Sequence, residues 1–308
     1  MNVLIAADME GIAGIEHYGD CLPSHPRRYA RGRRLLTDEV LAAVEALRAG
    51  GAGTISVGDW HMVGTNIERE RMPAGVLVRP IADLALNEAE PSIAKAHGGP
   101  LDAVVMVGHH ARTPSPRGFC SHTFIWEMEV LLDGEQLSET QTYAQALAAE
   151  GIPILVAGGD RWLLEETEEG ELGSARKVVT KEGLGRARAR SVAPAAAHAH
   201  LREAIAEAMA GPLQPPPARS YPAELVIRVE GEEIARTTVG DPADLLTEIA
   251  TVFRAPAVSR EYRQLAKLLP PDSSPLRSLQ RHAGSLLATP VMRGKERDWL
   301  AAANQGSA

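Results

Sequence analysis

The chain has few cysteines and no long apolar run, and each shortage excludes a class of protein. Only Cys21 and Cys120 occur among 308 residues, so a framework of several disulfides is excluded, a single bridge stays open, and a reducing cytoplasm is expected. No stretch reaches the roughly 18–20 apolar residues that span a bilayer, so we expect no membrane partner. The first ten residues, MNVLIAADME, lack the basic leader and cleavage site of a signal peptide, and we expect none.

Positive charge and aromatic side chains are also in short supply. The formal net charge is −8, which argues against nucleic acid as a partner, because such binding needs a basic face. Ordinary solubility explains the acidity. Aromatic residues make up 4% of a chain that is 44% hydrophobic, so we expect an aliphatic core. The length allows one large domain or two modest ones.

Strand-like and helix-like segments alternate along the chain, as is typical of an α/β fold. Short apolar runs that suit buried parallel strands occur at residues 2–7, 54–57, 101–107 and 152–156. Helical patterns cover residues 31–49 and 139–150, and the dipeptide Asp133-Gly134 between them predicts a hairpin turn. We therefore predict a mostly parallel sheet flanked by helices, with a smaller C-terminal α+β part.

A glycine- and proline-rich run at residues 211–217 marks the predicted boundary between these parts. Residues 1–211 form the predicted α/β domain that carries the chemistry. Residues 212–269 form the smaller α+β part, with a strand at 223–229 and helices at 242–253 and 260–269. Residues 270–308 are a tail to which we assign no role.

Carboxylates and imidazoles follow the carboxyl ends of the predicted strands. Asp8 and Glu10 come after the first strand, His61 after the second, and His109-His110 after the third, where one of the two must point away from the other. These ends share one edge of a parallel sheet, so distant residues can converge there. Taken singly, such residues are more often helix caps or structural histidines. Together they favour a divalent metal, either zinc or its substitutes manganese and cobalt.

Several segments together resemble a known family. They are AADMEGIAG at the first strand, GDWH at the second, GHHAR at the third, the loop that ends in CSHTF, and VAGGDR after the fourth. They look like the zinc-dependent D-aminopeptidases that are associated with bacterial dipeptide-transport operons, and the likeness runs from residue 1 to about 265. The resemblance implies a homo-oligomer, a homodecamer with an internal chamber. It also implies two Zn²⁺ per subunit and a water activated by them, which removes an N-terminal D-amino acid from short peptides.

Position by position, the resemblance makes Asp8 the ligand that bridges both zinc ions. It assigns Glu10 and His110 to one metal and His61 and Glu139 to the other, with Glu135 as a competitor for Glu139. It makes His122 the catalytic residue. The loop before His122 is one residue longer here than in the family.

Arg112, close to His110 in the sequence, is a candidate for binding a substrate carboxylate, although an ordinary surface or interface ion pair is the favoured explanation. Two other functions stay open on these residues. One is a different metal-dependent amidase or hydrolase with the same ligands. The other is a non-enzymatic peptide-binding protein, which would leave the convergent acids and histidines unexplained.

Overall fold

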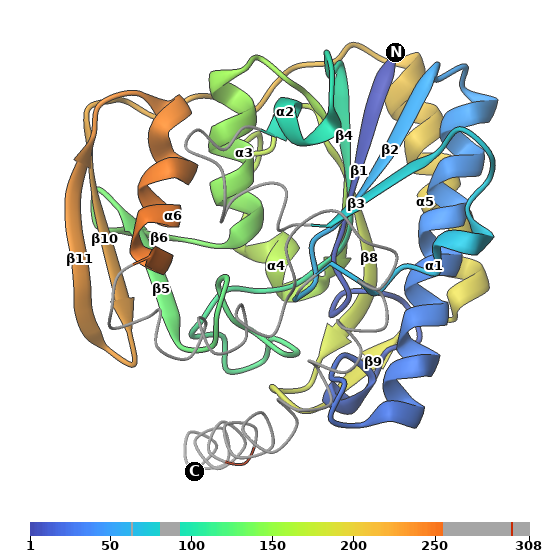
Figure 1. The fold of residues 1–308 in the computed structure, drawn as a ribbon, viewed down its shortest axis with the longest axis horizontal. Helices are drawn as coiled ribbons and strands as arrows, with labels where there is room; N and C mark the ends of the chain where they lie inside the picture. The colour runs from blue at the N-terminus through green and yellow to red at the C-terminus, as the bar shows by residue number, and fades with distance from the viewer. Residues whose placement is uncertain (63, 81–92, 255–296, 298–308) are drawn as a thin grey trace.

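The structure is a computed structural model that describes residues 1–62, 64–80, 93–254 and 297 (Figure 1). The described residues form two sheets. The larger sheet has the strand order β3-β2-β1-β4-β7-β8-β9, and every neighbouring pair is parallel except β8 with β9. Its strands are β1 (Asn2–Ala7), β2 (Thr54–Asp59), β3 (Leu77–Pro80), β4 (Ala103–His109), β7 (Ile154–Asp160), β8 (Arg176–Gly183) and β9 (Ala189–Ser191).

Helices cover both faces of this sheet. The alternation of side chains along β1 divides the core, because Val3 and Ile5 face one cluster whereas Leu4 and Ala6 face the other. The first cluster packs against α1 (Pro26–Ala49) and α5 (Pro194–Ala210). The second packs against α2 (Ile93–His97), α3 (Glu139–Ala149) and α4 (Arg161–Glu166). The predicted α/β class is confirmed.

The second sheet is antiparallel and has the order β11-β10-β5-β6. It combines β5 (Met128–Leu132) and β6 (Glu135–Leu137) with β10 (Ala223–Val229) and β11 (Glu232–Val239), and α6 (Leu245–Arg254) covers it. Asp133 and Gly134 form the turn between β5 and β6 with φ of 49° and 81°, which confirms the predicted hairpin. Short 3₁₀ helices occur at Tyr18–Asp20, Arg69–Arg71 and Pro242–Asp244.

The second sheet joins strands from both sides of the run at 211–217. The division into parts at 211 and 212 stays a prediction. The expected helix at 260–269 and the tail at 270–308 lie outside the described residues. Within the described part of the chain, no helix is both long and apolar enough to cross a membrane.

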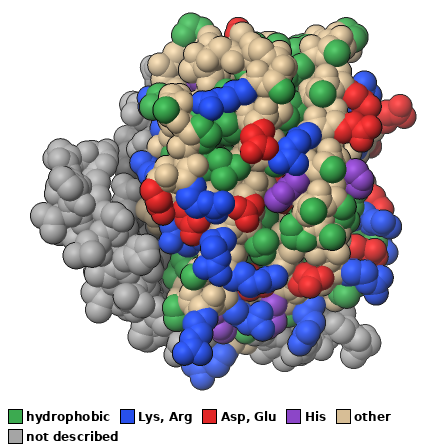
Figure 2. Space-filling view, turned by 90° about the vertical axis from the view of Figure 1, so that its right-hand side faces the viewer, with side chains coloured by type: hydrophobic (Ala, Val, Ile, Leu, Met, Phe, Trp, Pro, Cys, Tyr) green, Lys and Arg blue, Asp and Glu red, His purple; other side chains and the backbone are tan. Residues whose placement is uncertain are grey.

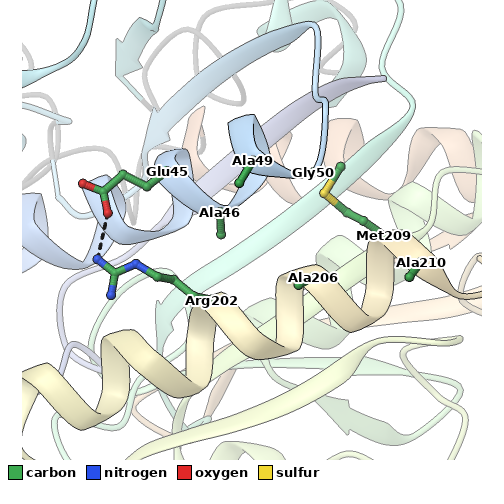
Figure 3. Close-up of a pocket in the computed structure, with 8 residues that line it drawn as sticks. All are labelled: Glu45, Ala46, Ala49, Gly50, Arg202, Ala206, Met209 and Ala210. Atoms are coloured by element: carbon green, nitrogen blue, oxygen red, sulfur yellow. Dashed lines mark hydrogen bonds and ion pairs between the residues drawn. The ribbon is translucent and has the colours of Figure 1, made fainter.

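The outer face of α1 and α5 carries both apolar and charged side chains (Figure 2), and a groove between the two helices is lined by alanines together with Gly50 and Met209. Lys and Arg side chains gather over the lower part of this face (Figure 2). Met209 of α5 lies beside Gly50 at the end of α1, and an ion pair of 2.8 Å between Arg202 and Glu45 joins the helices farther along the groove (Figure 3). The helices are therefore fixed to each other as well as to the sheet.

Candidate metal centre

Three adjacent parallel strands deliver the acids and imidazoles to one edge of the large sheet. Asp8 follows β1 directly, His61 lies two residues after β2, and His110 follows β4 directly. Because β1 lies between β2 and β4, these side chains converge. Asp8, Glu10, His61 and His110 are each at most 5% exposed. The convergence predicted from the strand ends is therefore what the fold produces.

Two glycines allow the loop after β1 to lie against the end of β4. Gly108 has φ of +77°, and a Cβ atom there would come within 2.1 Å of the Asp8 carbonyl oxygen. A Cβ atom at Gly11 would lie 2.1 Å from the carbonyl oxygen of His109. Because neither residue has a Cβ atom, the Gly11 N–H can donate to the Gly108 carbonyl at 2.6 Å. The close approach of the two backbones, which brings Asp8 next to His110, therefore requires glycine at positions 11 and 108.

The Asp8 carboxylate lies between two imidazoles. His61 Nδ1 is 3.5 Å from Asp8 Oδ1 and 2.9 Å from Glu10 Oε2. On the other side, His110 Nε2 is 3.3 Å from Asp8 Oδ2 and 3.6 Å from Glu139 Oε1. These distances group His61 with Glu10 and His110 with Glu139. The sequence resemblance paired Glu10 with His110 instead, and these two residues also form, with Asp8, a group of candidate ligand atoms that lie within 4.8 Å of one another.

Backbone carbonyls fix the orientation of both rings. The second nitrogen of His61, Nε2, donates to the Cys21 carbonyl at 2.8 Å, and Nδ1 of His110 donates to the Ala111 carbonyl at 3.0 Å. A neutral imidazole that donates through one nitrogen presents the other as an electron-pair donor. Metal-ligating histidines are held in this way in proteins generally. The other ring nitrogens, Nδ1 of His61 and Nε2 of His110, face the carboxylates.

Glu139 reaches the cluster from the first residue of α3. Ser138 is the N-cap of this helix, and its side chain and that of Gln141 form a capping box. The Phe124 N–H donates to Glu139 Oε1 at 2.6 Å, which holds the carboxylate next to His110. Glu135, the competing acid, instead accepts a hydrogen bond of 2.9 Å from Arg219. Of the two acids, only Glu139 contacts the cluster among the described residues.

The charges within the cluster shift its ionisation strongly. Burial alone would raise the pKa of Asp8, but the hydrogen bond to His61 and the charge of His110 lower it far below its usual range. Burial alone would lower the pKa of His61, but Glu10 and Asp8 raise it well above its usual value. Burial also opposes protonation of His110, and Glu139 and Asp8 raise its pKa to about 9. Without a metal, both imidazoles are therefore positively charged, with a proton on each ring nitrogen, at neutral pH.

The cluster has the oxygen and nitrogen donors that a divalent metal requires. Asp8 Oδ2 and Glu10 Oε2 are buried and accept no hydrogen bond from the described residues, although an imidazole lies within ion-pair distance of each. Candidate ligand atoms lie within 4.8 Å of one another in two overlapping groups, Asp8 with Glu10 and His110, and His110 with His122 and Glu139. Carboxylate oxygens and imidazole nitrogens are suitable ligands for zinc, so the residues fit such an ion.

His122 lies beside the cluster, on the loop between β4 and β5. Its ring stacks on that of His110, with centroids 4.1 Å apart, and its Nε2 is 3.8 Å from Glu139 Oε1. The Nδ1 atom of His122 donates to the Cys120 carbonyl at 2.7 Å. Cys120 has a φ of +48°, and this left-handed backbone conformation turns its carbonyl toward the ring. Burial and the charge of His110 lower the pKa of His122. It is thus a neutral histidine whose Nε2 faces the candidate metal ligands.

Other polar residues at the strand ends have structural partners. His109 points to the opposite face, where its ring packs on Trp60 and its Nε2 bonds the Ala6 carbonyl at 3.3 Å. Asp59 accepts hydrogen bonds from Asn66 and the backbone of Ile67. His109 and His110 therefore point to opposite faces of the sheet, as successive residues of an extended backbone do.

Arg112 lies outside the cluster. Its backbone N–H donates to Glu166 Oε2 at 3.1 Å, and its charge acts on Glu166 and Glu135. No ion pair joins Arg112 to the candidate ligands among the described residues, and its substrate-binding role stays a prediction.

Sequence reasoning missed two kinds of contribution to the site. Lys181 was given no role, yet its side chain is buried and its Nζ donates to the carbonyls of Glu10 and Ile15. Cys21 and Cys120 act through their backbone carbonyls, and both thiols are free. The strand that carries Lys181, RKVVTKEG, mixes polar and apolar residues, so the sequence marks neither the burial of this lysine nor the role of a backbone carbonyl.

A comparison with family models decides the identity of the chain. The model of the family described as D-aminopeptidase, Peptidase_M55, matches residues 1–263. The chain belongs to the D-aminopeptidase family. The match extends from β1 beyond α6 and includes every candidate ligand. It confirms the family that the sequence motifs indicated and the prediction that the chain is an enzyme, a peptidase.

Two relatives place this family member further. A D-aminopeptidase of Bacillus subtilis strain 168 is 26% identical over 223 residues, which are 70% of this chain and 78% of the relative. A solved structure, the Zn-dependent D-aminopeptidase DppA from Bacillus subtilis, a self-compartmentalizing protease, superposes with a TM-score of 0.68 at 20% identity. That likeness covers 82% of this chain and 97% of the solved one, and it confirms the fold.

Proposed function

We propose that this member of the D-aminopeptidase family is a two-zinc enzyme that removes the N-terminal D-amino acid from short peptides. The observation that carries the proposal is the position of Asp8 between His61 and His110, with one oxygen directed to each. A carboxylate in that position is suited to bridge two ions. The zinc dependence of the solved relative supports the choice of metal.

The ion-pair distances favour one of the two divisions of the ligands. We assign Glu10 and His61 to one ion and His110 and Glu139 to the other, with Asp8 shared. A zinc ion held by these residues would polarise a peptide carbonyl and lower the pKa of a bound water toward about 7. The ligand imidazoles must be neutral to bind, so His61 and His110 release their protons when the metal enters.

His122 is the residue we propose to move protons. Its lowered pKa leaves Nε2 without a proton at neutral pH, and the hydrogen bond to Cys120 fixes the ring so that this nitrogen faces the cluster. It can accept a proton from the attacking water and deliver it to the amine that leaves. Burial of the surrounding residues keeps the transfer away from bulk solvent and strengthens each electrostatic contact.

Assembly and location belong to the proposal as well. The solved relative is a self-compartmentalizing protease, which supports a homo-oligomer for this chain, and we propose the homodecamer that the sequence resemblance implies. Cys21 and Cys120 are both free thiols, which suits a reducing compartment such as the cytoplasm.

Metal content and cleavage, measured together, test the proposal. Protein purified without chelator is analysed for zinc per subunit and assayed on D-Ala and L-Ala peptides, before and after chelation. Asp8→Asn removes the central carboxylate charge, and Asp38→Asn, at an exposed residue that pairs with Arg71, is the matched control.

About two zinc ions per subunit and D-selective cleavage, both lost in Asp8→Asn and kept in Asp38→Asn, are expected. Zinc without peptide cleavage would favour another metal-dependent amidase or hydrolase. Zinc content that Asp8→Asn leaves unchanged would refute the site.

A further inference from the structure

A lysine side chain is buried within the fold directly behind the candidate ligands. Lys181 of β8 is 1% exposed and belongs to the largest fully buried side chains of the described residues. Its Nζ donates to the carbonyl oxygen of Glu10, and also to that of Ile15 at 2.7 Å. One ammonium group therefore holds both ends of the loop that contains the proposed ligand Glu10.

The surroundings of this ammonium are unusual for a buried charge. Within the described part of the chain, no carboxylate lies within 4.0 Å of Lys181 Nζ. Its closest contacts are the two carbonyls and the ring of Phe119, whose centroid is 4.8 Å away, and the carboxylates of Asp160 and Glu39 act on it at longer range. Burying an ammonium costs several kcal/mol unless its surroundings compensate. The compensation here comes mainly from the backbone of the ligand loop, so the lysine and the loop depend on each other.

An irregularity in the sheet turns Lys181 inward. The pairing of β7 with β8 runs in step as far as Gly159 with Val179 and then shifts, so that Asp160 pairs with Lys181. Thr180 and Lys181 are consequently both buried, although successive residues of a regular strand face opposite sides. Thr180 Oγ1 donates to the Gly11 carbonyl next to Glu10. The shift therefore directs two consecutive side chains at the same loop.

We propose that Lys181 is a positioning residue for the metal centre. By holding the Glu10 carbonyl, its ammonium fixes the peptide plane from which the Glu10 carboxylate extends toward His61. Partners that orient a ligand in this way contribute 10- to 100-fold to metal affinity or activity. The inference rests on the proposed metal site and adds to it a residue that does not touch the metal.

Lys177, on the same strand, provides a matched control. Its Nζ also donates to two backbone carbonyls, those of Leu164 and Thr167, both at 2.9 Å. Those acceptors lie at α4 and away from the ligand loop. Lys181→Met and Lys177→Met thus each remove one ammonium and two carbonyl contacts, but only the first removes a contact to a proposed metal ligand. Lys181→Gln keeps an N–H donor on a shorter side chain.

The test measures zinc affinity by competition with a chromogenic chelator, together with zinc per subunit and the thermal denaturation midpoint. We expect Lys181→Met to weaken zinc binding about 10- to 100-fold, Lys181→Gln to weaken it less, and Lys177→Met to stay within about 2-fold of wild type. Denaturation of the metal-free variants reports the structural contribution of each lysine separately.

Wild-type zinc affinity in folded Lys181→Met would overturn the inference. So would failure of both Lys181 variants to fold, since the lysine would then be a determinant of the fold as a whole. A wild-type protein that binds no zinc would refute the proposed metal site itself. A wild type that binds zinc but cleaves no peptide would leave the Lys181 inference standing and move the substrate elsewhere.

Discussion

The affinity of the enzyme for zinc should depend steeply on pH, because the metal has to displace protons. Asp8 and Glu139 raise the pKa of His110 to about 9, so this imidazole is protonated at pH 6.5 and still mostly protonated at pH 8. Each proton that must be displaced weakens binding tenfold for every pH unit below its pKa. Between pH 6.5 and 8, His110 alone should strengthen zinc binding about 30-fold. His61, whose pKa is also raised well above its usual value, should steepen this dependence further.

Competition with a chelator of known protonation behaviour measures this slope at constant ionic strength. Calorimetry in two buffers with different ionisation enthalpies counts the released protons independently. His110→Gln should reduce the proton count by one. His198→Gln, a change at a histidine of α5 remote from the cluster, should leave it unchanged.

A slope well below one decade per pH unit would refute the reasoning. It would mean that the imidazoles of the metal-free protein are neutral. The short distances from His61 and His110 to the carboxylates would then not be ion pairs.

Three further outcomes follow from the same structure. His122→Ala should retain zinc but lose most of kcat, and a kcat close to wild type would contradict its role as proton carrier. Burial raises the pKa of Glu39 from 4.5 to about 7, so the wild type should lose stability relative to Glu39→Gln as pH rises through that range, by about 2–3 kcal/mol between pH 5 and 8 in urea denaturation. Gly108→Ala should lower both the denaturation midpoint and zinc content, whereas Gly151→Ala, also at positive φ but in open space, should lower only the midpoint.

The large sheet could be predicted because its central strands are short apolar runs. The segments expected at 2–7, 54–57, 101–107 and 152–156 correspond to β1, β2, β4 and β7, and only their boundaries differ, by up to four residues. The second sheet could not be predicted. It pairs β5 with β10 across about ninety residues, and a pairing of that span leaves no local pattern. The sequence of β11, EEIARTTV, is too polar to stand out as a strand.

The candidate ligands could be located by their positions after strands, but their neighbours could not. Periodicity correctly predicted that only one residue of the pair His109-His110 faces the cluster. The choice between Glu135 and Glu139 needed the structure, because it depends on Arg219, more than eighty residues away, which pairs with Glu135. Lys181 was missed because, in a regular strand, its side chain would point to the opposite face from that of Thr180. The register shift after Gly159, which buries both side chains, has no signature in the sequence.

The cluster also has to fold before any metal binds, and its charges explain how it can. Asp8, Glu10 and Glu139 bring three carboxylates into a buried space, which their mutual repulsion would oppose. In the metal-free protein, protons on His61 and His110 oppose that repulsion, which is why the pKa of each is raised. In the proposed two-zinc state those two protons would be gone, and the carboxylates would face four positive charges in place of two. The repulsion among the carboxylates is therefore offset by protons in the metal-free protein and by zinc in the metal-bound protein. One rigid arrangement of the strand ends can serve both states, and the protons maintain the ligand geometry until zinc replaces them.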